Sequence, residues 1–242
     1  MSRDRLFQQQ SSNRDFRFTA QVAEVFDDML ERSIPNYQQV IEMSAQLLNR
    51  LLQPGDTIYD LGCSTGNTLV LLGRLLQIPE LTLQGIDNSP AMIAKARRKA
   101  ENYHLPYPLE FIAADITTHP CQPAGAIILN YTMQFLRPPA RADFAAHLYH
   151  ALRPGGALLL SEKIILHDPE LNRHYIEFHH DFKRARGYSE IEISKKREAL
   201  ENVLIPFSAA ENRQLLEQAG FKRVEQFSQW FNFASWLAIK KE

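Results

Sequence analysis

The N-terminal part of the chain, residues 1–53, carries apolar residues at helical spacing. The spacing predicts one helix over about 19–32 and a second over about 37–52, with the break between them at Pro35. Residues 1–17 are polar and irregular, so we expect them to form a loose arm. Because both helices precede the first predicted strand, we expect residues 1–53 to form a helical lid over a binding site.

The middle of the chain alternates short apolar runs with helical patterns. The expected strands are 57–61, 82–86, 109–113, 126–129 and 157–161. The expected helices between them are 66–76, 90–103 and 139–152. Ser89 followed by Pro90 is a typical start for the second of these helices. Repeated alternation of strand and helix predicts an α/β fold with a doubly wound, mostly parallel sheet.

Residues 163–207 return to helical periodicity and hold two helical stretches, which we interpret as a helical insertion. Ser189 and Glu192 form a capping box for the second stretch. One face of the first stretch is apolar. Its members are Leu171, Tyr175, Phe178 and Phe182. The apolar surface of the helices in this insertion is larger than a minimal fold needs to cover its sheet. We therefore expect a homodimer formed largely through the insertion.

The chain closes with one more helix and two β-rich runs. The helix is expected over 208–219, with Gly220 at its C-terminal end. The runs 222–228 and 232–239 are joined by few residues, so we expect them to pair as an antiparallel hairpin. The whole pattern predicts a single domain, 1–242, with a seven-stranded, mostly parallel sheet, an antiparallel last strand and extra helices.

The composition narrows the class of protein. The 242 residues are 45% apolar and 23% charged, which is ordinary for a globular protein. A net charge of −1 argues against tight, direct binding to tRNA or DNA, because no overall positive field would attract the phosphates. The two cysteines, Cys63 and Cys121, make no disulfide framework. Neither a membrane-spanning run nor an apolar signal core is present, so we expect a cytoplasmic protein without membrane contacts.

A glycine-containing turn follows the first expected strand, with Asp60 at the strand end and glycines at positions 62 and 66. The chain lacks the Gly-Lys-Ser/Thr of a P-loop, and Ser64 stands where a dinucleotide fingerprint has its second glycine. Unpaired N–H groups at the start of the next helix favour an anion, while Asp60 favours a cation. The turn therefore predicts a site for a zwitterion such as an amino acid.

Polar residues also follow the next strands, at the sheet edge where open α/β folds bind ligands. In chain order, the set at the strand ends is Asp60, Asp87, Asn88, Asp115, Ile116 and Asn130. A carboxylate at Asp87 can accept both hydroxyls of a ribose. Asp115 can accept from an adenine amino group, with Ile116 against the ring. Each residue alone would more often be a solvated loop residue, but together they indicate an adenosyl cofactor.

Several stretches resemble known proteins. Asp60 before the glycine turn, with Asp87 after the next strand, resembles the first motif of class I S-adenosylmethionine-dependent methyltransferases. Residues 21–29, 32–37, 87–93, 134–136 and, as the specific part, 179–203 resemble one family of that fold, the carboxy-S-adenosyl-L-methionine synthases. The resemblance covers nearly the whole chain.

The resemblance implies a class I methyltransferase-like fold and an unusual activity. Such a synthase converts S-adenosyl-L-methionine and prephenate to carboxy-S-adenosyl-L-methionine, phenylpyruvate and water, and passes its product to a second enzyme that modifies tRNA wobble uridines. S-adenosyl-L-methionine is then a substrate, and no metal is implied. The residues that match the family's ligand contacts are Tyr37, Gly62, Cys63, Ser64, Asp87, Asn88, Asp115, Ile116, Asn130 and Arg197.

The residues themselves leave two other function classes open. An ordinary methyltransferase acting on a small molecule or RNA would release S-adenosylhomocysteine. A non-catalytic cofactor-binding partner of a tRNA-modifying enzyme would leave its ligands unchanged. No histidine is paired with a nucleophile, so the sequence indicates no catalytic base. The adjacent His179 and His180 would point in different directions on a helix, and we expect a surface or interface role rather than metal binding.

Arg197 has an argument of its own. It shares one helical stripe with Ile193, Leu200 and Leu204, and an arginine inside an apolar stripe must find an anion. A structural salt bridge or a snorkelling side chain would explain it equally well. In the family, Arg197 matches the residue that holds the carboxylate of the modified cofactor. In a homodimer it would reach the cofactor of the other subunit.

Overall fold

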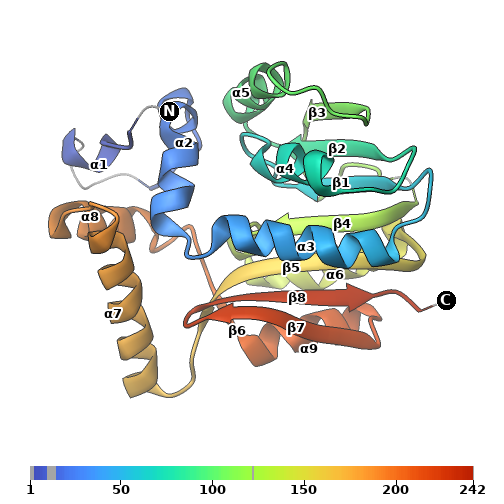
Figure 1. Cartoon of the computed structure of the whole chain (residues 1–242). Helices are drawn as coiled ribbons and strands as arrows, with labels where there is room; N and C mark the ends of the chain where they lie inside the picture. The colour runs from blue at the N-terminus through green and yellow to red at the C-terminus, as the bar shows by residue number, and fades with distance from the viewer. Residues whose placement is uncertain (1–2, 10–14, 122, 242) are drawn as a thin grey trace.

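The computed structural model describes residues 3–9, 15–121 and 123–241. The chain folds around one mixed sheet with helices on both faces (Figure 1). The strands on the main path are β1 (Thr57–Leu61), β2 (Thr82–Asp87), β3 (Leu109–Ala113), β4 (Ala124–Asn130), β5 (Leu152–Ile165), β7 (Arg223–Trp230) and β8 (Phe233–Ile239). Their order across the sheet is β3-β2-β1-β4-β5-β8-β7, and the short β6 (Phe207–Ser208) pairs with β5 off this path.

The directions of the strands agree with those predicted from the sequence. Neighbouring strands from β3 to β5 are parallel, and β8 runs antiparallel to both β5 and β7. The predicted seven-stranded sheet with an antiparallel last strand is therefore confirmed, with β6 as an addition. The expected strand at 157–161 is too short, because β5 continues to Ile165 by pairing with β6 and β8. This extension carries Lys163 beyond the last register pair between β4 and β5.

The helices begin and end close to the predicted positions. They are α1 (Leu6–Gln9), α2 (Ala20–Ser33), α3 (Tyr37–Leu51), α4 (Asn67–Leu75), α5 (Pro90–Ala100), α6 (Pro138–Ala151), α7 (Pro169–Ala185), α8 (Glu190–Leu200) and α9 (Ala209–Ala219), with a 3₁₀ turn, η1, at Met133–Phe135. The Ser89 side chain caps α5 by accepting from the backbone N–H of Met92. The capping box of Ser189 and Glu192 starts α8, as predicted.

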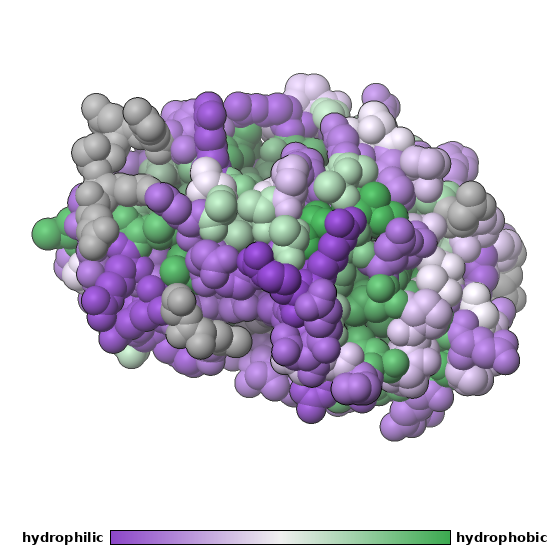
Figure 2. All heavy atoms as spheres, turned by 90° about the horizontal axis from the view of Figure 1, so that it is seen from above, coloured by the Kyte–Doolittle hydropathy of each residue, from purple (hydrophilic) through white to green (hydrophobic). Residues whose placement is uncertain are grey.

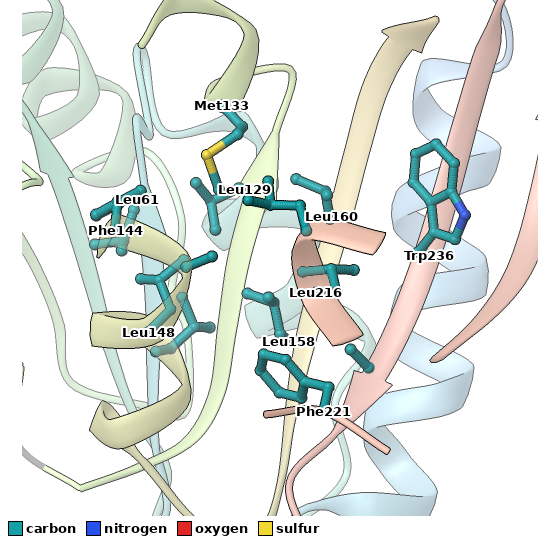
Figure 3. Packing of buried hydrophobic residues seen from close by; sticks show 14 of the residues in the cluster. Leu61, Leu129, Met133, Phe144, Leu148, Leu158, Leu160, Leu216, Phe221 and Trp236 are labelled. Atoms are coloured by element: carbon teal, nitrogen blue, oxygen red, sulfur yellow. The ribbon is translucent and has the colours of Figure 1, made fainter. Parts of the chain in front are cut away.

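Two hydrophobic layers enclose the sheet. On one face α6 and α9 pack against the strands through Phe144, Leu148 and Leu216, in a cluster that also holds Phe221 and Trp236 (Figure 3). On the other face α3, α4 and α5 contribute the second cluster, which includes Leu48, Leu69 and Ile93. Nearly every residue of β4 is buried, because this central strand is covered on both sides. The scaffold that positions the strand ends is therefore tightly packed.

Helices α1, α2, α7 and α8 form a group to one side of the sheet (Figure 1). Residues 3–9 belong to this group, so the prediction of a loose arm is wrong for them, and residues 10–14 lie outside the described ranges. Asp4 is 1% exposed; its backbone N–H donates to Asp28 Oδ2 at 2.7 Å, and its Oδ2 accepts from the hydroxyl of Tyr188 at 2.6 Å. The polar composition of this segment did not indicate that it is ordered, because buried hydrogen bonds and the buried Phe7 hold it in place.

The surface carries several apolar side chains. Seen from above, hydrophobic residues gather in the middle of the face and hydrophilic residues border them (Figure 2). The large exposed hydrophobic side chains are Tyr103, Ile165, Leu171, Phe178, Ile191 and Phe231. Phe178 lies against Phe231, with ring centroids 4.4 Å apart, so the apolar face of α7 and the β7–β8 turn form one aromatic patch. Among the described residues, none of the helices has the length and hydropathy to cross a bilayer.

Candidate functional site

A cavity of about 1320 Å³ lies at the carboxyl ends of β1, β2 and β4. It exceeds the usual range of small-molecule sites, roughly 300–1,000 Å³, and so has room for two ligands. All of the residues that match the family's ligand contacts line it. They are Tyr37, Gly62, Cys63, Ser64, Asp87, Asn88, Asp115, Ile116, Asn130 and Arg197. The fold thus brings these residues together, while their contacts with a cofactor stay a prediction.

The two glycines of the turn are required by the packing of the chain itself. Gly62 has φ +82°, and a Cβ there would lie 2.4 Å from Thr132 Oγ1. Gly66 has φ +78°, and a Cβ there would lie 2.5 Å from Phe111 Cζ. Both positions therefore exclude other residues, whatever the ligand. The turn thus packs closely against Thr132 of the loop after β4 and against Phe111 of β3.

Three backbone N–H groups of the glycine turn, which precede the start of α4, are not available to an anion. The backbone N–H groups of Gly62 and Cys63 donate to the carbonyl of Ile86, and that of Ser64 donates to Asp87 Oδ2 at 3.0 Å. These donors are therefore used within the chain. The sequence could not indicate this, because the acceptors come from the next strand.

A carboxylate from the lid segment lies beside the start of α4. Asp27 of α2 accepts from the hydroxyl of Thr65 and, at 3.0 Å, from Asn67 Nδ2. Lys99 Nζ lies 2.8 Å from Asp27 Oδ2, and the two side chains are 15% and 9% exposed. Asp27 thus lies beside the helix start through side-chain contacts, and an anion at the backbone N–H groups of α4 stays a prediction. This contact joins the N-terminal helices to the cofactor turn.

The acids after β2 and β3 present acceptors to the cavity in different ways. Asp87 is buried, and its oxygens accept from the backbone N–H groups of Ser64 at 3.0 Å and Ser89 at 2.8 Å. Each carboxylate oxygen keeps a second acceptor position, which suits a pair of ribose hydroxyls. Asp115 is exposed, and Oδ1 accepts from the backbone and hydroxyl of Thr117. These hydrogen bonds lower the pKa of Asp115, so it is an ionised acceptor at the rim.

Two buried acceptors beside Tyr37 have no hydrogen-bond donor within the described residues. They are Asp60 Oδ2 and Asn130 Oδ1. Asn130 is held in place by its Nδ2, which donates to Thr68 Oγ1 at 3.2 Å. Burial, with a smaller effect from the nearby Asp87, raises the pKa of Asp60 to about 8. Unpaired buried acceptors next to a carboxyl fit an ammonium group, such as that of the amino-acid part of S-adenosyl-L-methionine.

The opposite wall of the cavity comes from β5, α7 and α8 and carries positive charge. Lys163, Lys183 and Lys196 line it, and burial lowers the pKa of each ammonium group. Lys196 donates to Ser33 Oγ at 2.8 Å. The cavity is therefore divided into an acidic half at the strand ends and a basic half under the helical insertion. Within the described ranges, no three His, Cys, Asp or Glu side chains gather as a metal site would need.

Two expectations about this wall are wrong: that Arg197 lies inside a buried apolar stripe, and that His179 lies at the surface. Arg197 lines the cavity but is exposed, and no residue within the described ranges forms an ion pair or hydrogen bond with its side chain. The buried face of α8 consists instead of Glu192, Ile193 and Lys196, because the capping box and the bond to Ser33 turn that face inward. His179 is not on the surface: it is 5% exposed, and its Nε2 donates to the carbonyl of Ser33 at 2.8 Å.

Sequence reasoning missed Lys163, Lys183 and Asn232, all of which line the cavity. For Lys183 a signal existed. Helical spacing places it on the same side of α7 as Asn172, Ile176 and His179, about 100° around the helix from the apolar face. No site was predicted on this side of the helix, and the structure turns it toward the cavity.

Comparisons with known proteins agree with this geometry. Residues 58–156 match the family model described as a methyltransferase domain. A carboxy-S-adenosyl-L-methionine synthase from Desulfotalea psychrophila is 53% identical over 240 residues, covering 99% of this chain and 98% of that protein. One from Campylobacter concisus is 48% identical, covering 98% and 100%. Human N-acetylserotonin methyltransferase, solved in complex with S-adenosylmethionine, superposes with a TM-score of 0.63 at 16% identity, covering 92% of this chain and 56% of that chain.

Proposed function

The chain belongs to the carboxy-S-adenosyl-L-methionine synthase family, and we propose that it takes the carboxyl group for its product from prephenate. The chain is a transferase with a class I methyltransferase fold. The observation that carries the proposal is the division of one large cavity into a half with the carboxyls of Asp87 and Asp115 and a half with clustered lysines. A sulfonium cofactor with an ammonium group suits the first half, and a dicarboxylate suits the second.

The proposed reaction balances without an external oxidant or reductant. S-adenosyl-L-methionine supplies the sulfonium methyl carbon that receives the carboxyl group. Prephenate gives up its ring carboxylate as carbon dioxide and its ring hydroxyl as hydroxide, which leaves phenylpyruvate. The hydroxide and the proton lost from the methyl group form water. Because the ring of prephenate becomes aromatic, the chain needs to orient and enclose the reactants rather than supply a strong base.

We assign the acidic half to S-adenosyl-L-methionine. Asp60 and Asn130 would accept from its ammonium group, Asp87 from its ribose hydroxyls and Asp115 from its adenine. Ile116, which is 9% exposed, would lie against the adenine ring. The orphan acceptors at Asp60 and Asn130 support this assignment, because neither has a hydrogen-bond donor within the described chain. The N-terminal helices 1–53, with Tyr37 in the cavity wall, would act as the lid.

We assign Arg197 to the carboxylate of the modified cofactor. Its guanidinium lines the cavity and has no ion-pair partner within the described residues, so it is available for a bidentate contact. The exposed aromatic patch supports a homodimer through the 163–207 insertion, because Leu171 and Phe178 are 50% and 41% exposed on one face of α7. In that dimer Arg197 would serve its own cavity or that of the partner.

We further propose that the product passes to a second enzyme that modifies tRNA wobble uridines, and that the protein works in the cytoplasm. A net charge of −1 supports a small-molecule enzyme that leaves the tRNA to its partner. The two free cysteines, Cys63 and Cys121, agree with a reducing compartment.

Mass spectrometry of the ligand that co-purifies with the protein tests the proposal. Carboxylated S-adenosyl-L-methionine is the expected ligand. Recovery of S-adenosylhomocysteine alone, with methyl transfer to an added acceptor, would make the chain an ordinary methyltransferase.

A further inference from the structure

Helix α7 turns its polar side toward the cavity. Asn172, Ile176, His179, His180 and Lys183 line the cavity from one side of the helix, and the buried residues of α7 are His179 and Lys183. Its aromatic residues instead point to the patch on the β7–β8 turn. A helix normally buries its apolar face. The inverted arrangement indicates that the space next to α7 holds a polar occupant.

The ammonium groups of Lys183 and Lys163 have no ion-pair partner among the residues that the structure describes. Lys183 is 8% exposed, and across residues 3–9, 15–121 and 123–241 neither Nζ takes part in a hydrogen bond or an ion pair. Burial lowers the pKa of Lys183, and repulsion from Lys196 and Lys163 lowers it further. Lys163 pairs in register with Phe233, whose ring lies 4.8 Å from that of His179. Two clustered cations without an anion are costly to bury unless a ligand supplies one.

Asn232 gives an independent sign of the same ligand. It is 1% exposed and lines the cavity, yet neither Nδ2 nor Oδ1 has a hydrogen-bond partner in the described chain. Its backbone carbonyl accepts from the N–H of Ile164 at 2.8 Å, which places Asn232 next to Lys163. A buried side-chain amide with a free donor and a free acceptor is rare in a folded protein. Both groups are available to a bound molecule.

The neighbouring charged groups do not neutralise this cluster. Glu162 precedes Lys163, but its oxygens accept from the backbone N–H groups of Met133 at 2.8 Å and Gln134 at 3.0 Å. His179 donates to the carbonyl of Ser33, and burial holds its pKa well below the usual value, so the ring is neutral. The acids of the cofactor half, Asp60 and Asp87, belong to β1 and β2 on the far side of β4. Glu198 and Glu201 of the insertion also line the cavity, but within the described residues neither forms an ion pair with Lys163 or Lys183. The two ammonium groups therefore keep no carboxylate partner among the described residues.

We propose that Lys163, Lys183 and Asn232 form the binding site for a carboxylate of the second substrate. In the reaction proposed above, on which this inference rests, that substrate is prephenate. The carboxylate accepts from the two ammonium groups and from Asn232 Nδ2. Asn232 Oδ1 accepts from a hydroxyl group, which prephenate carries on its ring. None of these residues matches a cofactor contact, so the site positions the carboxyl donor separately from S-adenosyl-L-methionine.

The variants Lys183→Met and Asn232→Ala test this site. Prephenate binding to the full-length protein is measured by calorimetry in the presence of S-adenosylhomocysteine, with phenylpyruvate as a second probe. Each variant should weaken prephenate binding roughly ten- to a hundredfold, the range for one lost hydrogen bond to a charged group. Affinity for S-adenosyl-L-methionine should change less than about twofold. The control is Lys195→Met, which removes a lysine of α8 outside the cavity lining and should leave both affinities unchanged.

Thermal unfolding separates binding from a structural role. Since the side-chain polar groups of Lys183 and Asn232 have no partner in the described part of the ligand-free chain, removing either should leave the midpoint unchanged or raise it. Variants that unfold earlier and lose both ligands would overturn the proposal, as would unchanged prephenate affinity. If the unmodified protein makes carboxylated product and both variants keep a normal KM for prephenate, the proposed function stands and this site does not. If the unmodified protein binds neither prephenate nor phenylpyruvate, both fail.

Discussion

Replacing Asp27 with alanine should remove the polar contact between the N-terminal helices and the cofactor turn, and should lower the free energy of unfolding. The change removes the charged partner of Lys99, whose Nζ lies 2.8 Å from Asp27 Oδ2, and the acceptor for Thr65 and Asn67. Among the described residues, Lys99 keeps only its neutral acceptors, Thr65 Oγ1 and Asn67 Oδ1. Breaking a buried ion pair typically costs about 3–5 kcal/mol, because the remaining charge stays buried without compensation. Lys99 keeps 15% exposure, so water can reach it in the variant. We therefore expect unfolding to become easier by about 2–4 kcal/mol.

The matched control is Glu24→Ala, which removes the same charge from the same helix. Glu24 is 59% exposed and pairs with Lys95 and Arg98 of α5, each at 3.3 Å. Exposed pairs of this kind contribute about 0–1 kcal/mol. Urea unfolding with a common m-value gives both differences. Asp27→Ala should also weaken binding of S-adenosyl-L-methionine, because Thr65 and Asn67 line the cavity, whereas Glu24→Ala should not.

A double-mutant cycle with Lys99→Met isolates the pair. If Lys99 is the main group left uncompensated, the double variant should be more stable than the sum of the single changes predicts, by about 1 kcal/mol or more. Two results would refute the view that this contact stabilises the packing of the lid segment on α4. One is additive changes in the free energy of unfolding, and the other is an Asp27→Ala destabilisation no larger than that of Glu24→Ala.

Three further predictions concern the site and the assembly. Arg197→Leu should leave binding of S-adenosyl-L-methionine nearly normal while carboxylated product falls roughly a hundredfold, the scale of one lost charged contact; intact turnover would remove Arg197 from the reaction. Because burial raises the pKa of Asp60 to about 8, the carboxyl is mostly protonated at neutral pH, and an incoming ammonium group should lower that pKa and release a proton. Calorimetry in buffers of different ionisation enthalpy should detect this release below that pKa and lose it above, and Asp60→Asn should abolish it; observed heats that are the same in every buffer would contradict the assignment. Phe178→Glu should shift the protein from dimer to monomer in light scattering, since Phe178 is 41% exposed in the aromatic patch, and an unmodified protein that is already a monomer with full activity would exclude the dimer.

The sheet could be predicted from the sequence because its signals are local. Strand β4 is a continuous apolar run and β2 is followed by a capped helix, so their positions follow from periodicity and turn residues alone. The strand-end acids follow from the rule that open α/β sheets bind ligands at that edge. The turn conformation at Gly62 was only partly predictable, because its close neighbour Thr132 is distant in sequence.

The basic half of the site could not be predicted, because helical periodicity does not say which face of a helix is buried. The apolar face of α7 was expected at a dimer interface, and periodicity did not indicate that His179 and Lys183 are the side chains turned inward. The same ambiguity put Arg197 inside an apolar stripe, whereas capping by Ser189 and the bond from Lys196 to Ser33 bury a different face of α8. Such choices depend on contacts between segments more than a hundred residues apart.

The most direct test of the central claim is the fate of the ring carboxyl carbon of prephenate. The purified protein is incubated with S-adenosyl-L-methionine and prephenate labelled with ¹³C at that carboxyl, and the nucleoside products are separated and weighed by mass spectrometry. We predict a product heavier than S-adenosyl-L-methionine by one labelled carbon dioxide, with phenylpyruvate formed in equal amount. Unlabelled product, or release of phenylpyruvate with the cofactor unchanged, would contradict the account.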